Sequence, residues 1–297
     1  MPNLKAWISA ARLRTLPLSI SGIIVGSSLA IENLFWKSPI FWLAILTTIG
    51  FQVLSNFAND YGDGVKGTDD HRDGEKRLVA SGIISPKQMK TAILVTVIIT
   101  LLIAIILIYQ AFGSEDFLHS LLFFILGIAS VVAAIKYTVG ENAYGYTGFG
   151  DVFVFLFFGL LSVLGSSYLF IHQLKWEFII PASTIGLLSM AVLNLNNMRD
   201  IENDAKNQKN TLVVKLGSSK AKVYHYVLIG LSLVLAVFYT LINFQSISQF
   251  TFLIAFIPLI INLVTVYKNR EPKLLDSELK KVALSTFLFA ILFGFFH

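Results

Sequence analysis

Residues 39–69 read PIFWLAILTTIGFQVLSNFANDYGDGVKGTD and join a long apolar run to an acidic segment. The run over residues 39–57 carries no charge, and about 20 apolar residues suffice to cross a bilayer as a helix. Asn56, Asp60 and Asp63 follow at spacings i, i+4 and i+7, so they share one face if the helix continues through them. Asp60 and Asp63 would then repel each other unless a cation lies between them. The stretch predicts a membrane helix that ends in a cation site.

A second acidic segment, NNMRDIEND at residues 196–204, closes another apolar run. Asn196, Asp200 and Asp204 fall at i, i+4 and i+8, again on one helical face. We expect the two faces to confront each other and hold Mg²⁺, which prefers carboxylates together with the oxygens of a substrate phosphate. The metal ligands predicted in this way are Asp60, Asp63, Asp69, Asp200 and Asp204.

Each acidic segment has a plainer interpretation. The second could be a capped helix end with a polar exit. In the first, Asp69 lies past two glycines and could equally face solvent. Arg199 falls on a neighbouring face and is interpreted as a charge anchor at the membrane surface.

The whole composition indicates an integral membrane protein. The chain has 297 residues, of which 55% are hydrophobic and 14% charged, whereas soluble domains carry roughly 25% charged residues. Nine apolar runs are long enough to act as spans, at residues 16–31, 39–57, 89–112, 117–135, 152–171, 178–198, 223–243, 250–267 and 282–296. They are continuous rather than alternating, which argues against a β-barrel. The prediction is an all-α fold: a single transmembrane domain over residues 1–297, with nine transmembrane helices around a central cavity.

Lysine and arginine set the expected orientation. With the N-terminus placed in the cytoplasm, only Lys37 and Lys175 of the 23 basic residues fall in the outer segments. Both acidic segments then face the cytoplasm, at the lipid bilayer surface. The net charge of +5 follows from this sorting and does not indicate a nucleic-acid partner.

The two acidic segments also resemble each other, because Asn56 and Asp60 have the same spacing as Asn196 and Asp200. This indicates two related helical halves around the cavity. Repeated halves with a site between them are also typical of transporters, so a cation-coupled transporter remains an alternative.

Between the acidic segments runs KYTVGENAYGYTGFGD, residues 136–151. Lys136 ends the fourth predicted span, where it could place a point charge on a phosphate or extend to the interface. Asp151 opens the fifth span as an N-cap, or it orients Lys136 or a metal-bound water.

These motifs resemble the UbiA-type membrane prenyltransferases, whose first motif usually reads NDxxDxxxD. Asn59, Asp60 and Asp63 match it, while Gly67 stands at the last acidic position and Asp69 follows. The lengthened form NDYGDGVKGTD is similar to the branch of 1,4-dihydroxy-2-naphthoate polyprenyltransferases. So are RLRTLPLSISG (12–22), KYTVGENAYGYTGFGDVFVFLFFG (136–159) and NNMRDIENDAKNQKNTLVVKLG (196–217). A departure is Gln208, where that branch usually has Gly.

The resemblance implies Mg²⁺-dependent transfer of a prenyl group from a polyprenyl diphosphate to 1,4-dihydroxy-2-naphthoate, with loss of carbon dioxide. The product would be demethylmenaquinone, made at the cytoplasmic side of a bacterial inner membrane. The catalytic residues implied are Asp60, Asp63, Lys136, Asp151, Asp200 and Asp204. The substrate-binding residues implied are Arg12, Arg14, Asn56, Asn59, Lys66, Arg77, Tyr137, Tyr146, Asn196 and Lys209. Other aromatic acceptors, namely 4-hydroxybenzoate, homogentisate or a haem precursor, remain alternatives.

Overall fold

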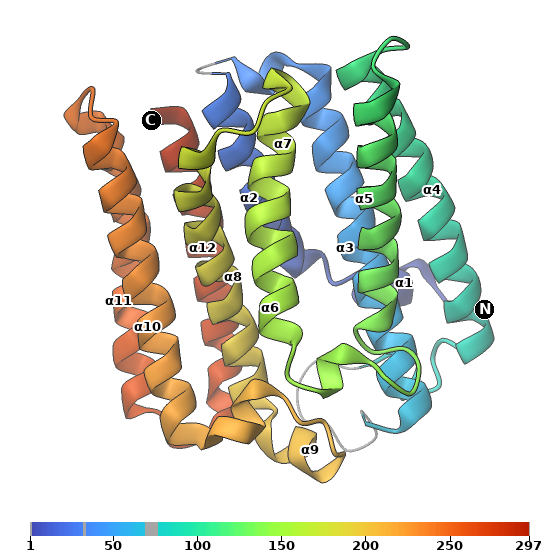
Figure 1. Ribbon diagram of the computed structural model, residues 1–297. Coiled ribbons are helices and arrows are strands. Elements are labelled where there is room, and N and C mark those ends of the chain that lie inside the picture. Colours follow the sequence, from blue (N-terminus) through green and yellow to red (C-terminus); the bar gives the residue numbers. More distant parts are fainter. Residues whose placement is uncertain (1, 32–33, 69–76, 297) are drawn as a thin grey trace.

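The computed structural model describes residues 2–31, 34–68 and 77–296 and contains only helices and loops over these ranges (Figure 1). The α-helices in these ranges are α1 (Leu4–Ala11), α2 (Leu16–Ala30), α3 (Pro39–Lys66), α4 (Pro86–Phe112), α5 (Phe117–Lys136), α6 (Gly150–Val154), α7 (Ser162–Ile171), α8 (Ile179–Arg199), α9 (Ile201–Lys206), α10 (Leu212–Ile242), α11 (Phe256–Lys268) and α12 (Asp276–Phe296). A π-helical segment η4 (Phe155–Leu161) joins α6 to α7, and a 3-10 segment η6 (Ile247–Ala255) precedes α11. Within the described ranges, nine helical stretches are long and apolar enough to cross a membrane, which confirms the all-α, nine-span prediction. The orientation in the membrane stays a prediction.

Local signals account for where the long helices begin and end. Ser38 caps α3 by accepting a hydrogen bond from the backbone N–H of Ile40, and Pro39 stands at the first position. Ser85 and Gln88 form a capping box at the start of α4. Gly67 ends α3 in the left-handed conformation, with φ of 74°, that only glycine adopts without strain. The first acidic segment therefore lies on the last turns of α3, as its spacing predicts.

The second acidic segment does not lie on one continuous helix. The helix α8 ends at Arg199, Asp200 occupies the junction with φ of −95° and ψ of 7°, and α9 begins at Ile201. Backbone hydrogen bonds from Asp200 to Asn196 and from Asp204 to Asp200 still bridge the junction. The spacing is thus nearly helical, but the segment bends at Asp200.

Close backbone packing holds the bundle together. The helix α2 packs against α3, α7, α8 and α12, and α8 packs against α10, α12 and η4. A Cβ atom added at Gly159 would lie 2.7 Å from the Cα of Gly186, so η4 and α8 touch through their backbones. Small residues at such crossings let membrane helices approach closely.

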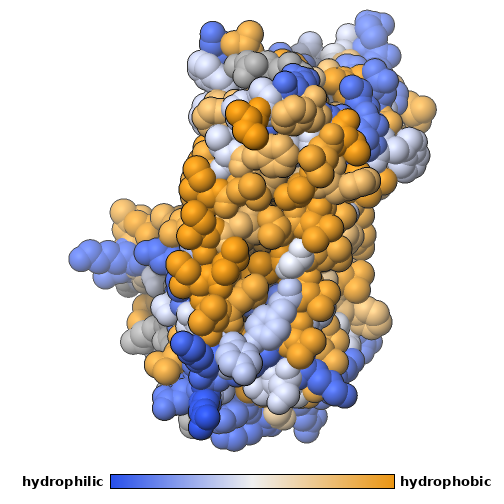
Figure 2. All heavy atoms as spheres, turned by 90° about the vertical axis from the view of Figure 1, so that its left-hand side faces the viewer, coloured by the Kyte–Doolittle hydropathy of each residue, from blue (hydrophilic) through white to orange (hydrophobic). Residues whose placement is uncertain are grey.

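The outside of the bundle is apolar over its middle. Figure 2 shows a broad hydrophobic band on one face, with hydrophilic residues at both ends. Exposed aliphatic side chains on α4 and α10 include Leu94, Ile98, Leu102 and Val234. Such a band matches the hydrocarbon layer of a bilayer.

The predicted span over residues 16–31 coincides with α2, but the segment before it forms a helix that was not predicted. The helix α1 is separate from α2, and the chain turns between them at Arg12, whose φ is 48°. Trp7 on α1 makes an edge-to-face contact with Phe57 on α3, with ring centroids 5.9 Å apart. A small hydrophobic cluster gathers the inner face of α1 with residues of α3, α4 and the segment before α4: Ala6, Ala10, Ala11, Phe57, Leu78, Val79, Ile84 and Met89.

Candidate active site

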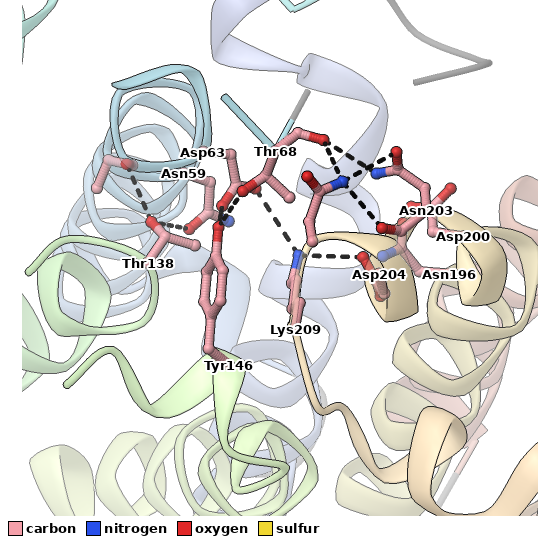
Figure 3. A network of polar contacts seen from close by, with 12 residues as sticks. Asn59, Asp63, Thr68, Thr138, Tyr146, Asn196, Asp200, Asn203, Asp204 and Lys209 are labelled. Carbon is pink, nitrogen blue, oxygen red and sulfur yellow. Dashed lines mark hydrogen bonds and ion pairs between the residues drawn. The ribbon is translucent and has the colours of Figure 1, made fainter. Parts of the chain in front are cut away.

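The two acidic segments meet at the end of the bundle that carries α9 (Figures 1 and 3). The side-chain amide of Asn203 donates to the carbonyl oxygen of Thr68 at 3.0 Å, across 135 residues of sequence. The ammonium nitrogen of Lys209 lies 3.8 Å from Oδ2 of Asp63 and 3.7 Å from Oδ1 of Asp204. Both carboxylates are buried. One carboxylate from each segment therefore faces a shared position, and a positive charge of the chain itself lies there.

Tyr146 fixes the Asp63 carboxylate on one side. Its hydroxyl group donates to Oδ1 of Asp63 at 2.8 Å and lies 2.8 Å from the hydroxyl group of Thr68. Burial raises the pKa of Tyr146, and the Asp63 charge raises it further, so the phenol stays protonated and keeps donating. The Lys66 ammonium lies 4.0 Å from the centre of the Tyr146 ring and that of Lys209 5.4 Å from it. Three of the predicted substrate-binding residues thus gather around Asp63.

Asp60 points to a different neighbourhood from Asp63. Its two carboxylate oxygens accept backbone N–H groups of Leu78 and Val79, each at 3.1 Å. Arg12 lies near enough to interact electrostatically with Asp60. Asp60 thereby holds the backbone at Leu78 and Val79, ahead of α4, and its role as a metal ligand stays a prediction.

The two asparagines predicted beside Asp60 have different surroundings. Asn56 is buried and donates its side-chain amide to the carbonyl oxygen of Ala11 at 2.8 Å, so it ties α3 to α1. Asn59 accepts a hydrogen bond from the hydroxyl group of Thr138 at 3.2 Å and lines the central cavity. Asn59 therefore remains placed for substrate contact.

In the second segment, Asp200 is engaged by Arg199. The guanidinium donates Nε to Oδ1 and Nη2 to Oδ2 of Asp200, both at 2.8 Å. The same Nη2 also donates to Oδ1 of Asn196 at 2.8 Å. Arg199 is 7% exposed, so its interpretation as a membrane-surface anchor is wrong. The spacing carried no signal for this contact, because adjacent helical residues do not face each other and only the bend at Asp200 brings them together.

Two of the residues predicted between the acidic segments, Lys136 and Asp151, differ in burial. Lys136 ends α5 and is exposed. Asp151 is buried in α6 and accepts a hydrogen bond from the hydroxyl group of Tyr224 on α10 at 3.0 Å. Its carboxylate therefore neither pairs with Lys136 nor caps the helix. Tyr224 was missed because nothing in the sequence pairs two residues 73 positions apart.

The remaining predicted residues lie at the edge of the site or beyond the described ranges. Arg14 is exposed and its Nη1 lies 3.8 Å from Oδ2 of Asp276. Arg77 is half-buried at the start of the segment that Asp60 anchors. Tyr137 lines the cavity, and burial raises the pKa of its phenol, as do the charges of Asp151 and Asp63. Asp69 lies outside the described residues.

An apolar cavity of about 350 Å³ opens beside the acidic segments, between α2, α3, α4, α5, η4 and α7. Its lining near the acidic segments includes Asn56, Asn59, Tyr137 and Tyr144. Ile108 and Leu169 line it toward the opposite end of the bundle. A stack of aromatic rings forms part of its wall. The ring centroids of Tyr144 and Phe153 lie 3.8 Å apart, and those of Phe153 and Phe157 lie 6.1 Å apart.

A second apolar groove of about 710 Å³ runs between α5 and η4–α7 and shares five lining residues with the cavity. These are Phe123, Leu126, Phe157, Leu161 and Gly165. The two hollows therefore lie next to each other, share a wall and together offer adjacent apolar space.

The site fits a divalent cation that a ligand helps to coordinate. Among the described residues no group of three or more acidic or histidine side chains is arranged to hold a metal by itself. Mg²⁺, however, is usually held by one or two carboxylates together with phosphate oxygens and water. Asp63 and Asp204 could supply such a pair, and the Lys209 ammonium nitrogen, 3.8 Å and 3.7 Å from them, shows that a positive charge fits between the two carboxylates.

Comparison with known proteins agrees with this geometry. A family model described as the UbiA prenyltransferase family matches residues 19–293. The chain is 41% identical to 1,4-dihydroxy-2-naphthoate octaprenyltransferase of Haemophilus influenzae, over 98% of this chain and 95% of that protein. It is also 41% identical to the octaprenyltransferase of the same name from Escherichia coli, over 97% and 94%.

The fold also matches solved structures. One is a UbiA homolog from Archaeoglobus fulgidus bound to GPP and Mg²⁺, with a TM-score of 0.65 at 15% identity, over 97% of this chain and 99% of that one. Together with the family match over nearly the whole chain, this leaves one assignment: the protein belongs to the UbiA prenyltransferase family.

Proposed function

We propose that this protein transfers a polyprenyl group from a polyprenyl diphosphate to 1,4-dihydroxy-2-naphthoate. One observation carries the proposal: a buried carboxylate from each acidic segment faces a shared cation position, and Asn56 and Asn59 of the first segment line an apolar cavity beside it. A diphosphate with a long apolar tail has this combination of charge and shape. The naphthoate acceptor is supported by the names of the relatives that are 41% identical over nearly their whole length.

The headgroup would bind where the two segments meet. Asp63 and Asp204 would hold Mg²⁺, and Asp60 and Asp200 would join them after exchanging their present partners. Lys66 and Lys209 would contribute positive charge to the diphosphate. A Mg²⁺ ion held by these residues would supply positive charge to the leaving oxygen as the allylic C–O bond breaks.

The tail of the donor would lie in the apolar space. The first isoprene units would occupy the cavity beside Tyr144, Phe153 and Phe157, whose π faces stabilise an adjacent allylic cation. A cavity of about 350 Å³ is small even for a drug-sized ligand. The distal units of a long chain would therefore continue into the groove between α5 and α7.

The acceptor then completes the reaction. Its electron-rich ring attacks the allylic cation, and a new carbon–carbon bond forms. When the attacked carbon carries the carboxylate, the bond to the carboxylate breaks and its electron pair restores the aromatic ring. Diphosphate and carbon dioxide leave, and demethylmenaquinone is formed in its reduced, quinol form. Arg12, half-buried near Asp60, is placed better than the exposed Arg14 to hold the acceptor carboxylate.

The reaction with loss of carbon dioxide requires no proton transfer by Asp151. Its hydrogen bond to Tyr224 ties α6 to α10 instead, and it would support the cavity wall rather than act as a base. Lys136, being exposed, would act only if the loop closes over the headgroup. The active-site end would face the cytoplasm of a bacterial cell, in line with the distribution of Lys and Arg.

The test is transfer by membranes that contain the protein, with Mg²⁺, a labelled polyprenyl diphosphate and each acceptor in turn. We expect product from 1,4-dihydroxy-2-naphthoate and none after chelation of Mg²⁺. Asp63→Ala and Asp204→Ala should each abolish turnover while the protein still inserts in the membrane. Product from 4-hydroxybenzoate, homogentisate or a haem precursor, with none from the naphthoate, would contradict the acceptor.

A further inference from the structure

Arg199 is a buried cation at the junction of α8, α9 and α12. Its side chain is 4% exposed. Nε and Nη2 take both carboxylate oxygens of Asp200, and Nη1 donates to Oδ1 of Asp276 at 2.5 Å. A guanidinium removed from water needs anionic partners with good geometry, and here it has two.

Asp276 belongs to neither acidic segment. It is the first residue of α12 and lies 77 positions after Arg199 in the chain. Its second carboxylate oxygen lies 3.8 Å from Arg14, so two guanidinium groups and two carboxylates form a balanced group. Asp276 contacts the second acidic segment through Arg199.

The consequence concerns Asp200. In the present arrangement Asp200 neutralises Arg199, and it can turn toward another cation only if Arg199 keeps a second anionic partner. We propose that Asp276 is a positioning residue for Asp200: it retains the Arg199 guanidinium at the α8–α12 junction, so that the Asp200 carboxylate is released to Mg²⁺ and diphosphate. The inference rests on the proposed function, because it takes Asp200 as a ligand of that complex.

The test compares Asp276→Asn with Glu271→Gln in the purified full-length protein. Glu271 is an exposed carboxylate just before α12, so its variant makes the same change of charge near the same end of the bundle without touching Arg199. The main measurement is the rise in thermal midpoint on addition of Mg²⁺ with inorganic diphosphate, which needs no acceptor and no turnover. The second is the Mg²⁺ dependence of prenyl transfer.

Loss of a carboxylate that orients a metal-binding side chain typically weakens metal affinity by about 10–100-fold. We expect Asp276→Asn to shift the half-maximal Mg²⁺ concentration upward by that factor in both measurements, with kcat at saturating Mg²⁺ close to that of the unchanged protein. Glu271→Gln should leave the Mg²⁺ dependence unchanged. Asp276→Glu, which restores the charge, should recover most of the affinity and supplies a second variant if Asp276→Asn folds poorly.

A double variant tests the route through Arg199. In an Arg199→Gln background, Asp276→Asn should shift the Mg²⁺ dependence no further, because the guanidinium that it retains is gone. The inference would be overturned if Asp276→Asn showed the same Mg²⁺ dependence as Glu271→Gln. It would also be overturned if Asp276→Asn shifted the Mg²⁺ dependence equally in the unchanged protein and in the Arg199→Gln background. If Mg²⁺ and diphosphate stabilise the unchanged protein but no prenyl group reaches the naphthoate, the proposed acceptor is contradicted. The thermal-midpoint comparison of the variants still tests the role of Asp276 in that case.

Discussion

Replacing Lys209 by Met should make the folded protein depend on magnesium. The Lys209 ammonium lies 3.8 Å from Asp63 and 3.7 Å from Asp204, and each such pair is worth about 4 kcal/mol in gross Coulomb energy at an effective dielectric of 20. Desolvation offsets much of this, and removing one partner of a buried ion pair costs about 3–5 kcal/mol. Lys209→Met keeps the length of the side chain and leaves two buried carboxylates facing each other. The loss should lower the thermal midpoint by on the order of 10 °C in EDTA.

Saturating Mg²⁺ should restore most of that loss, because it takes the place of the ammonium between the carboxylates, and it should stabilise the unchanged protein less. The assay is thermal unfolding of the detergent-purified protein by circular dichroism, in EDTA and over a Mg²⁺ titration. Lys206→Met is the matched control: Lys206 lies on α9 and is exposed, so its loss should cost no more than about 0.5 kcal/mol. An equal midpoint loss of Lys209→Met with and without Mg²⁺ would refute the reasoning, as would no loss in EDTA.

Three further outcomes follow from single contacts. Tyr146→Phe removes a hydrogen bond to a charged carboxylate, worth about 1.5–3 kcal/mol, so kcat/KM for the polyprenyl diphosphate should fall at least about tenfold; an unchanged kcat/KM would argue against Tyr146 at the headgroup. Gln208 has a φ of 56°, and this backbone conformation costs a residue with a side chain about 1–2 kcal/mol. Gln208→Gly should therefore raise the thermal midpoint, despite the entropy that glycine loses on folding. A lower midpoint would contradict this. Gly159→Ala would place its Cβ 2.7 Å from the Cα of Gly186 and should destabilise the protein by about 1–3 kcal/mol. The matched change Gly230→Ala, where a Cβ meets nothing within 4 Å, should be neutral or stabilising, and equal midpoints for the two variants would show that η4 and α8 do not pack so closely.

The helices were predictable because hydrophobic length and capping act locally. The run that begins at Pro39 and the spacing of Asn56, Asp60 and Asp63 define α3 through its last turns. The meeting of the two acidic segments was also foreseen, since paired carboxylates at two helix ends need a shared cation. In the structure that shared cation is Lys209, which the sequence suggested only as a phosphate contact.

The partners of individual carboxylates could not be predicted. Asp60 and Asp63 are three residues apart on one helix, yet Asp60 holds the backbone at Leu78 while Asp63 meets Tyr146. These partners are set by where distant loops return to the bundle, and no periodicity encodes that. The contact between Asp151 and Tyr224 has the same origin, because it depends on how α6 and α10 cross.

The position of α1 has a consequence for how the protein is assembled in the membrane. Trp7 packs on Phe57, the carbonyl oxygen of Ala11 accepts from Asn56, and the rest of the small hydrophobic cluster comes from the residues before and at the start of α4. None of these surfaces exists when α1 leaves the ribosome. Although α1 precedes α3 and α4 in the chain, it can therefore dock only after α3 and the start of α4 have been made.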